Sequence, residues 1–138
     1  QTVTFSNAAT WADVVEFETG VAVDNADIGS MKFALSSSTV GKWKTILKVL
    51  AGAAGQFLIE GGEANGYPVH RTNQLSTNQS YFGVWSQLLH GLWATQEVIV
   101  DPYALKKSGG IEVTMNTFHD FLVRQPAAFE ISTDTAAV

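Results

Sequence analysis

The histidines are the side chains best suited to acid–base or metal chemistry, and the sequence scatters them. His70, His90 and His119 each lack a second histidine three or four residues away, the spacing that places two ligands on one helix face. Asp120 directly follows His119, and adjacent side chains of a strand point to opposite faces. Isolated histidines are more often ordinary hydrogen-bonding residues. The spacing therefore favours no catalytic or metal site, and a small α+β hydrolase using these histidines is a distant alternative.

The glycine-rich segment at residues 61–66 is the second place to look for chemistry. Glu60 and Glu63 flank its first two glycines, and paired carboxylates can act as general acid and base. Acids beside glycine are more often solvated turn residues, and no Lys-Ser or Lys-Thr follows to make a phosphate-binding loop. The chain has neither a Gly-x-Ser-x-Gly elbow nor a cysteine. We therefore predict that it is not an enzyme and uses no cofactor and no metal.

The tryptophans are better explained by packing than by ligand binding. Trp11, Trp43, Trp85 and Trp93 can form a stacking platform for bases or sugars, but the chain is poor in the basic residues that accompany such platforms. We therefore expect these side chains in the core or at contacts with other proteins, where tryptophan serves as an anchor.

The composition is that of one folded domain with few charges. The chain has 138 residues, of which 46% are hydrophobic and 15% charged, and this excludes long-range disorder. Its net charge of −5 argues against a protein that binds nucleic acid through phosphate contacts. A surface poor in charge is typical of a protein that contacts other proteins. Polar residues interrupt the uncharged stretch at 72–96, so we predict no membrane span.

The first half of the chain predicts a helix and then a strand. Thr10 can cap a helix that begins at Trp11, and Asp13 stands where a carboxylate completes a capping box. Residues 31–35 alternate as in a strand. The start at Gln1, without methionine or apolar leader, fits a piece of a longer polypeptide and a trimmed chain equally well.

A second helix is predicted after the small polar residues at 36–39. Its apolar stripe has helical spacing, and Gly52 or Gly55 would end it. The stripe consists of Val40, Trp43, Leu47 and Leu50.

The second half consists mainly of strand-like segments. Two early helices followed by several strands predict an α+β protein with a mixed or antiparallel sheet. We expect one unit over residues 1–132 and a frayed tail over 133–138. The strand candidates are 56–60, 67–71, 81–85, 88–93, 97–100, 111–115, 121–123 and 129–131.

The second half of the chain contains five short motifs: GYPV at 66–69, YFGVWSQ at 81–87, VIVDPY at 98–103, GIEV at 110–113 and DFLVRQPAAF at 120–129. In their order and spacing they resemble the carboxyl-terminal part of the major capsid proteins of tailed phages, whose fold is named after coliphage Hong Kong 97. The strand, polar cap and helix predicted from residue 33 onward also look like a segment of that family. The resemblance covers about three quarters of the chain.

The resemblance implies a structural protein. It suggests the family's axial domain together with the last strands of the peripheral domain, without counterparts of the amino-terminal arm, extended loop and long spine helix. The expected role is that of a capsid subunit in a tailed phage or prophage. Such a subunit self-associates into pentamers or hexamers that enclose the DNA genome, and it assembles in the host cytoplasm. The alternative is an encapsulin-type nanocompartment shell, which shares the fold and encloses protein cargo.

A polar, uncharged loop is the predicted contact region between subunits. Its side chains can hydrogen-bond across an interface at a lower desolvation cost than charges. The negative net charge predicts that packaged DNA lies near the wall without specific binding. The contact candidates are Gln74, Ser76, Thr77, Asn78 and Gln79.

Overall fold

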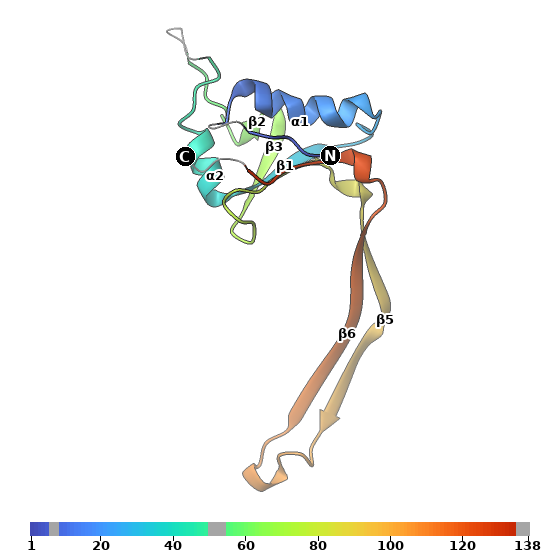
Figure 1. Ribbon diagram of the computed structural model, residues 1–138. Helices are drawn as coiled ribbons and strands as arrows, with labels where there is room; N and C mark the ends of the chain where they lie inside the picture. The colour runs from blue at the N-terminus through green and yellow to red at the C-terminus, as the bar shows by residue number, and fades with distance from the viewer. Residues whose placement is uncertain (6–8, 50–54, 135–138) are drawn as a thin grey trace. The chain divides into compact units, whose positions relative to one another are not determined.

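The computed structural model describes residues 1–5, 9–49 and 55–134 (Figure 1). Contacts between residues divide the chain into two units. Unit 1 comprises residues 1–87 and 125–138, and unit 2 is Leu88–Arg124. The predicted single unit over 1–132 stays a prediction, and residues 135–138 of the predicted tail lie outside the described residues.

Helix α1 spans Trp11–Val23, as the sequence predicts. The Asp13 backbone N–H donates to Thr10 Oγ1, and the Thr10 N–H donates to Asp13 Oδ2 at 2.7 Å, which completes the capping box. The buried face of α1, formed by Val14, Phe17 and Val21, packs on the sheet of unit 1.

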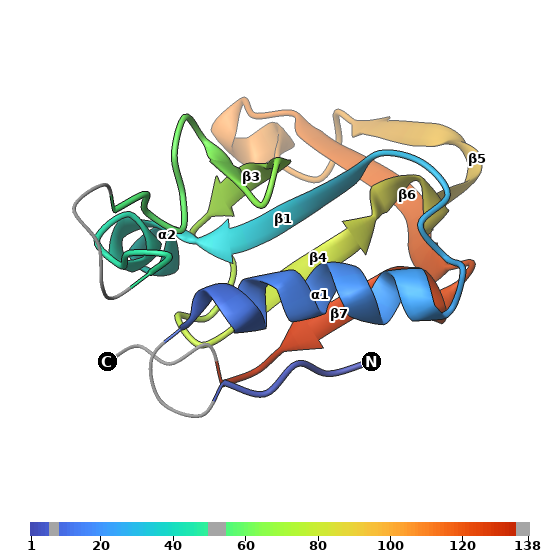
Figure 2. The ribbon, with the colours of Figure 1, turned by 90° about the horizontal axis from the view of Figure 1, so that it is seen from above.

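The sheet of unit 1 has five strands in the order β2-β3-β1-β4-β7. Strands β1 and β3 run parallel, and the other pairs are antiparallel, so the sheet is mixed. Helix α1 lies across it above β4 and β7 (Figure 2). The predicted α+β class, with two main helices and a mixed sheet, is confirmed. The strands are β1 (Met31–Ser36), β2 (Glu63–Ala64), β3 (Tyr67–Thr72), β4 (Ser80–Val84) and β7 (Phe129–Ser132).

Helix α2 spans Ser37–Trp43, so the second helix is confirmed, but the prediction that it continues along the apolar stripe beyond Trp43 is wrong. Ser36 caps it, and its backbone leaves the helix at Lys44. The next residues pair with a later segment instead: the Lys48 N–H donates to the Gln56 carbonyl, and Leu58 N–H to the Ile46 carbonyl. These backbone hydrogen bonds replace those of a longer helix. Leu50 and Gly52 lie outside the described residues.

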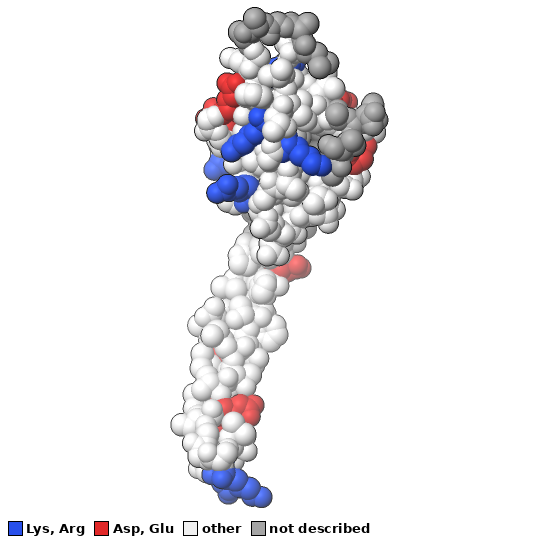
Figure 3. Space-filling model, turned by 90° about the vertical axis from the view of Figure 1, so that its left-hand side faces the viewer, with Lys and Arg blue, Asp and Glu red and all other residues white. Residues whose placement is uncertain are grey.

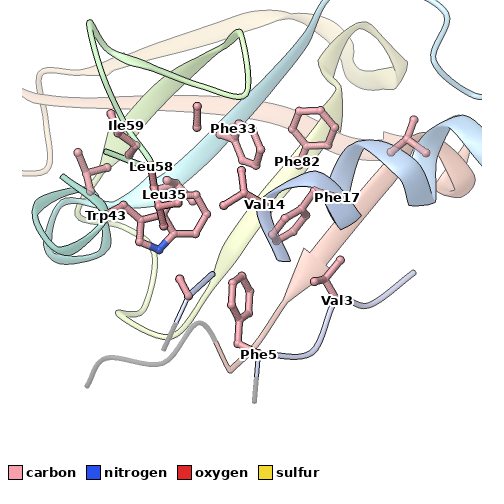
Figure 4. Close-up of a cluster of buried hydrophobic side chains, with 14 of the residues drawn as sticks. Val3, Phe5, Val14, Phe17, Phe33, Leu35, Trp43, Leu58, Ile59 and Phe82 are labelled. Atoms are coloured by element: carbon pink, nitrogen blue, oxygen red, sulfur yellow. The ribbon is translucent and has the colours of Figure 1, made fainter. Parts of the chain in front are cut away.

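Aromatic rings form the centre of the unit 1 core (Figure 4). Phe33 and Phe82 are cross-strand neighbours with ring centroids 4.4 Å apart. Phe17 of α1 meets Phe33 edge-on at 5.7 Å, and Trp43 of α2 meets it from another side at 6.2 Å. The rings therefore join both helices to the sheet.

A hydrogen-bonded carboxylate ties the edge of the sheet to α1. Glu18 accepts hydrogen bonds from the Tyr67 hydroxyl at 2.8 Å and from the Asn65 amide at 2.5 Å. Burial, the hydrogen bond to Glu18 and the charges of Glu18 and Asp27 together raise the pKa of Tyr67 to about 12. Tyr67 therefore stays a donor at neutral pH.

Unit 2 is a two-stranded antiparallel hairpin of β5 (Leu88–Asp101) and β6 (Glu112–Val123). The sequence predicts four short strands here, and the structure joins them into two long ones. A bulge between Trp93 and Glu97 explains the break in the sequence pattern, and Ala94 there has φ of 66°. Three short 3₁₀ turns complete the described elements: η1 (Trp85–Gln87), η2 (Lys106–Ser108) and η3 (Pro126–Ala128). None of the helices in the described part of the chain has the length and apolar character needed to cross a bilayer.

Candidate interaction surfaces

The hairpin has two faces of different chemistry. Side chains alternate along each strand, so directly paired residues share a face. Leu88 pairs with Val123 on one face, whereas Leu89 pairs with Leu122 on the other. The first, which we call the uncharged face, bears no Asp, Glu, Lys or Arg. Its members are Leu88, His90, Leu92, Val98, Val100, Val113, Met115, Thr117, His119, Phe121 and Val123.

The opposite face combines apolar side chains with four carboxylates. We call it the acidic face, and its apolar residues include Trp93 and Phe118, which are directly paired. The lysines of the hairpin stand apart from both faces, in the η2 turn at its tip. The carboxylates are Glu97, Asp101, Glu112 and Asp120.

Both faces of the hairpin are exposed within this chain. On the uncharged face Met115 and Phe121 are 62% and 58% exposed, and on the acidic face Phe118 and Trp93 are 64% and 59% exposed. An isolated two-stranded hairpin is marginally stable at best, because nothing covers its apolar side chains. Contiguous apolar surface of this kind marks a contact site. Of the two faces, the uncharged one is better suited to full burial, since no ionised group there must be desolvated.

The histidines do not converge on a site. His90 and His119 share the uncharged face, where His90 stacks on Phe121 with ring centroids 4.5 Å apart. The His119 ring meets those two rings edge-on. His70 lies in β3 of unit 1. Among the residues described, no group of three or more His, Asp or Glu side chains is arranged to hold a metal ion.

Glu60 and Glu63 stabilise a turn through hydrogen bonds with the local backbone. The backbone groups of Glu60 and Glu63 exchange two hydrogen bonds, of 3.1 and 2.9 Å. Glu60 Oε1 accepts from the Phe57 N–H at 2.8 Å, so one carboxylate is engaged by local backbone. Gly61 and Gly62 have φ of 60° and 91°, values that favour glycine and explain its use in this turn. The arrangement is that of a structural turn.

The predicted contact loop connects β3 to β4. Thr39 Oγ1 of α2 donates to the Thr77 carbonyl at 2.9 Å, and the Gln79 N–H donates to the Ser76 carbonyl at 3.0 Å, so the loop backbone is held in place. Gln74, Ser76, Thr77 and Asn78 are exposed and Gln79 is half-buried. Their role in subunit contacts stays a prediction.

The tryptophans divide between core and surface. Trp43 is 1% exposed in the core of unit 1, as predicted, whereas Trp93 stands out on the acidic face of the hairpin. Trp85 is half-buried, and its indole N–H donates to the Lys32 carbonyl at 2.9 Å. The core interpretation is therefore wrong for Trp93, which is placed where a contact anchor would be.

Comparison with known proteins gives a curated relative and a set of solved structures. The chain is 27% identical over 135 residues to the major capsid protein of Halomonas phage phiHAP-1, a match that covers 98% of this chain and 22% of that protein. Its fold matches a chain of Mycobacterium phage Che8 with a TM-score of 0.68 and 12% identity, covering 99% of this chain and 54% of that one. It also matches a virus-like particle from Pyrococcus furiosus with a TM-score of 0.60 and 12% identity, covering 91% and 54%. No protein-family model matches the chain.

The fold is therefore that of a phage capsid protein. The resemblance of the sequence to the tailed-phage major capsid proteins is confirmed by the curated relative. The chain spans about a fifth of the length of that relative and about half of the matched structures.

Proposed function

We propose that this chain is part of a structural capsid subunit of a tailed phage or prophage, which associates with copies of itself into a DNA-enclosing shell. The observation that carries the proposal is a sequence match along 98% of the chain to a phage major capsid protein, together with a capsid fold. On this view the protein is located in the virion capsid, is assembled in the host cytoplasm, and catalyses no reaction.

The surface chemistry supports self-association. A shell is stabilised by many identical contacts, and a heterologous contact repeated around an axis closes a ring of five or six subunits. The uncharged face of the hairpin is an apolar surface of the kind such contacts bury. The polar loop around Ser76 and Asn78 remains a candidate for contacts near the ring axis.

The low positive charge supports non-specific containment of DNA. Lys and Arg together number eight against thirteen acidic residues. A wall with this balance carries more negative than positive charge, so packaged DNA lies against it without strong retention.

The encapsulin alternative follows from the shared fold, and the fold match to a virus-like particle from Pyrococcus furiosus supports it. That likeness is one of fold, at 12% sequence identity, whereas the curated sequence relative is a phage protein. The phage capsid is therefore the better-supported function.

The test is to express the polypeptide that carries these residues and to examine gradient-purified material by electron microscopy. Closed shells, or rings of five or six subunits, are expected. Nuclease-protected DNA in shells formed with the packaging machinery would support a phage capsid, whereas enclosed protein cargo would favour the encapsulin alternative. Material that stays monomeric at every concentration would contradict both.

A further inference from the structure

A groove of about 430 Å³ lies in unit 1 beside α2 and β3. Val40, Ile59 and Val69 supply apolar side chains to it. Three basic groups, those of Lys44, His70 and Arg71, line it as well and are all exposed. The groove therefore suits a ligand that carries apolar and negatively charged groups close together.

Two of the basic side chains of unit 1, those of Lys44 and Arg71, line this groove. Figure 3 shows several Lys and Arg side chains on the face of unit 1 that bears α2. Lys48 is engaged, because its ammonium lies 4.4 Å from the centre of the Trp11 ring. Lys44 and Arg71, in contrast, form no ion pair with any carboxylate of the described residues. Their charges are free to meet carboxylates from outside the chain.

The turn between α1 and β1 has the complementary chemistry. Val23 and Ile28 are 73% and 68% exposed, a high value for branched apolar side chains. Asp24 and Asp27 lie between them in sequence and are also exposed. Asp24 accepts a hydrogen bond from the Gln1 side chain.

Backbone hydrogen bonds hold this turn in shape. The Ala26 N–H donates to the Val21 carbonyl at 3.1 Å, and Asn25 N–H to the Ala22 carbonyl at 2.9 Å. Ala26 is buried in the core, so the turn is anchored at its middle. A preformed turn loses little conformational entropy when it docks.

The turn and the groove lie at opposite ends of β1. The turn leads into Met31, the first residue of the strand, whereas the groove residue Val69 pairs with Phe33 and the chain enters α2 after Ser36. Figure 2 shows α2 at one end of the sheet and the loop that leads into β1 at the other. One copy cannot fill its own groove with its own turn, but a second copy can.

We propose that the turn at residues 23–28 of one copy docks into the groove of the next copy. Val23 and Ile28 contact its apolar side chains, and Asp24 and Asp27 face Lys44 and Arg71. The contact is heterologous, so its repetition around an axis closes a ring or continues as a filament. This inference rests on the proposed self-associating subunit and assigns residues to one of its contacts.

The first experiment uses the absence of native cysteine. Chains carrying Ile28→Cys and chains carrying His70→Cys are mixed in equal amounts and oxidised. Disulfide-linked pairs containing one of each are then measured by mass spectrometry on non-reduced samples. These mixed pairs are expected in clear excess over random pairing. A matched pair, Thr19→Cys with His70→Cys, places the first thiol on an exposed part of α1 and is expected to give random pairing only. Random pairing for Ile28→Cys as well would overturn the proposal.

The second experiment tests the charges by reversal and rescue. The double change Lys44→Glu and Arg71→Glu in the His70→Cys chain is expected to slow mixed pairing about tenfold. Asp24→Lys and Asp27→Lys in the Ile28→Cys chain are expected to restore the rate. A rate that does not depend on these charges would overturn the proposed pairing. If the chains bind duplex DNA and Lys44→Glu with Arg71→Glu abolishes that binding while mixed pairing is unchanged, the basic residues are assigned to phosphate and the proposal is overturned.

The outcomes separate this inference from the proposed function. Shells formed by the unsubstituted polypeptide, combined with random pairing of the two cysteines, would leave the capsid function standing and remove this contact. Absence of shells from the unsubstituted polypeptide would count against the function itself. Urea unfolding of every variant checks that the substitutions leave the fold intact.

Discussion

The two units use the same kinds of apolar residue in opposite ways. In unit 1, Phe33 and Phe82 are fully buried between the sheet and its helices, whereas Phe118 and Phe121 of the hairpin stand mostly in solvent. The difference lies in the number of layers, since a sheet buries side chains only where another element covers it. Unit 1 has a second layer in α1 and α2, and the described hairpin has none.

The two units therefore differ in the source of their stability. Unit 1 contains a closed core and is expected to fold without a partner. The hairpin exposes a face without a single formal charge, so its burial would cost no desolvation of ionised groups. We therefore expect the hairpin to be completed by a contact, and unit 1 to stand without one.

The largest effect is expected from matched phenylalanine substitutions in the two units. Phe33→Ala removes a ring that contacts Phe17, Trp43 and Phe82, and it is expected to lower the free energy of unfolding by about 3–5 kcal/mol. Phe118→Ala on the hairpin is expected to change it by less than about 0.5 kcal/mol. Urea unfolding followed by circular dichroism measures both. Equal losses would show that the hairpin buries Phe118 and would remove the contrast.

Alanine substitutions at one glycine of each unit test the same contrast, with a smaller expected effect. A Cβ on Gly83 would lie 2.9 Å from Phe129 Cα and overlap the Ala128 carbonyl, so β4 and β7 would have to move apart. Gly83→Ala is expected to cost about 1–3 kcal/mol of unfolding free energy.

Gly91→Ala in the hairpin is the control. A Cβ there meets only the end of the Trp93 ring, at 3.0 Å, and that exposed side chain can turn away. A change of less than about 0.5 kcal/mol is expected in the same unfolding experiment. A large loss at Gly91 would mean that the acidic face is packed as tightly as the core.

Local signals in the sequence predicted much of unit 1. The Thr10 and Asp13 capping box and the alternation at 31–35 are short-range patterns, and the structure confirms the helix and the strand. The apolar stripe at 40–50 has helical spacing and predicts a longer second helix than the structure has. The stripe did not reveal that Ile46 and Lys48 would pair with residues 56–58, and this non-local pairing decides the backbone.

Features made by residues distant in sequence were missed. The groove brings together Val40, Ile59 and Val69 from three separate segments, and no motif joins them. The sequence pattern predicts four short strands in place of the long hairpin, because the bulge after Trp93 interrupts the alternation of apolar and polar residues. The proposed docking turn is recognised only from the structure, because the exposure of Val23 and Ile28 beside Asp24 and Asp27 does not follow from the sequence.

The smallest effect concerns a carboxyl group that only unit 1 can bury. Glu130 of β7 is 2% exposed, and its carboxylate lies so close to α1 that a Cβ on Gly20 would overlap it. Burial raises the pKa of Glu130, the charges of Asp24 and Glu16 raise it further, and the Gln1 amino group opposes them. In the window between the ordinary carboxyl pKa and this raised value, the folded state holds a proton that the unfolded state has lost. Stability is therefore highest below that window and falls as pH rises through it.

Glu130→Gln replaces the titratable carboxyl group with a neutral amide, so the stability of the variant no longer depends on the ionisation of this side chain. The variant is expected to gain stability over the unsubstituted chain at about pH 7 and to differ little near pH 4, where Glu130 is already neutral. Urea unfolding at the two pH values measures the difference, with Glu112→Gln on the exposed hairpin as the control that changes neither value. An equal change at both pH values would show that the side chain acts through packing alone. A loss at pH 7 would show that the charged form is stabilised in the fold, and the buried carboxyl would then no longer distinguish unit 1 from the hairpin.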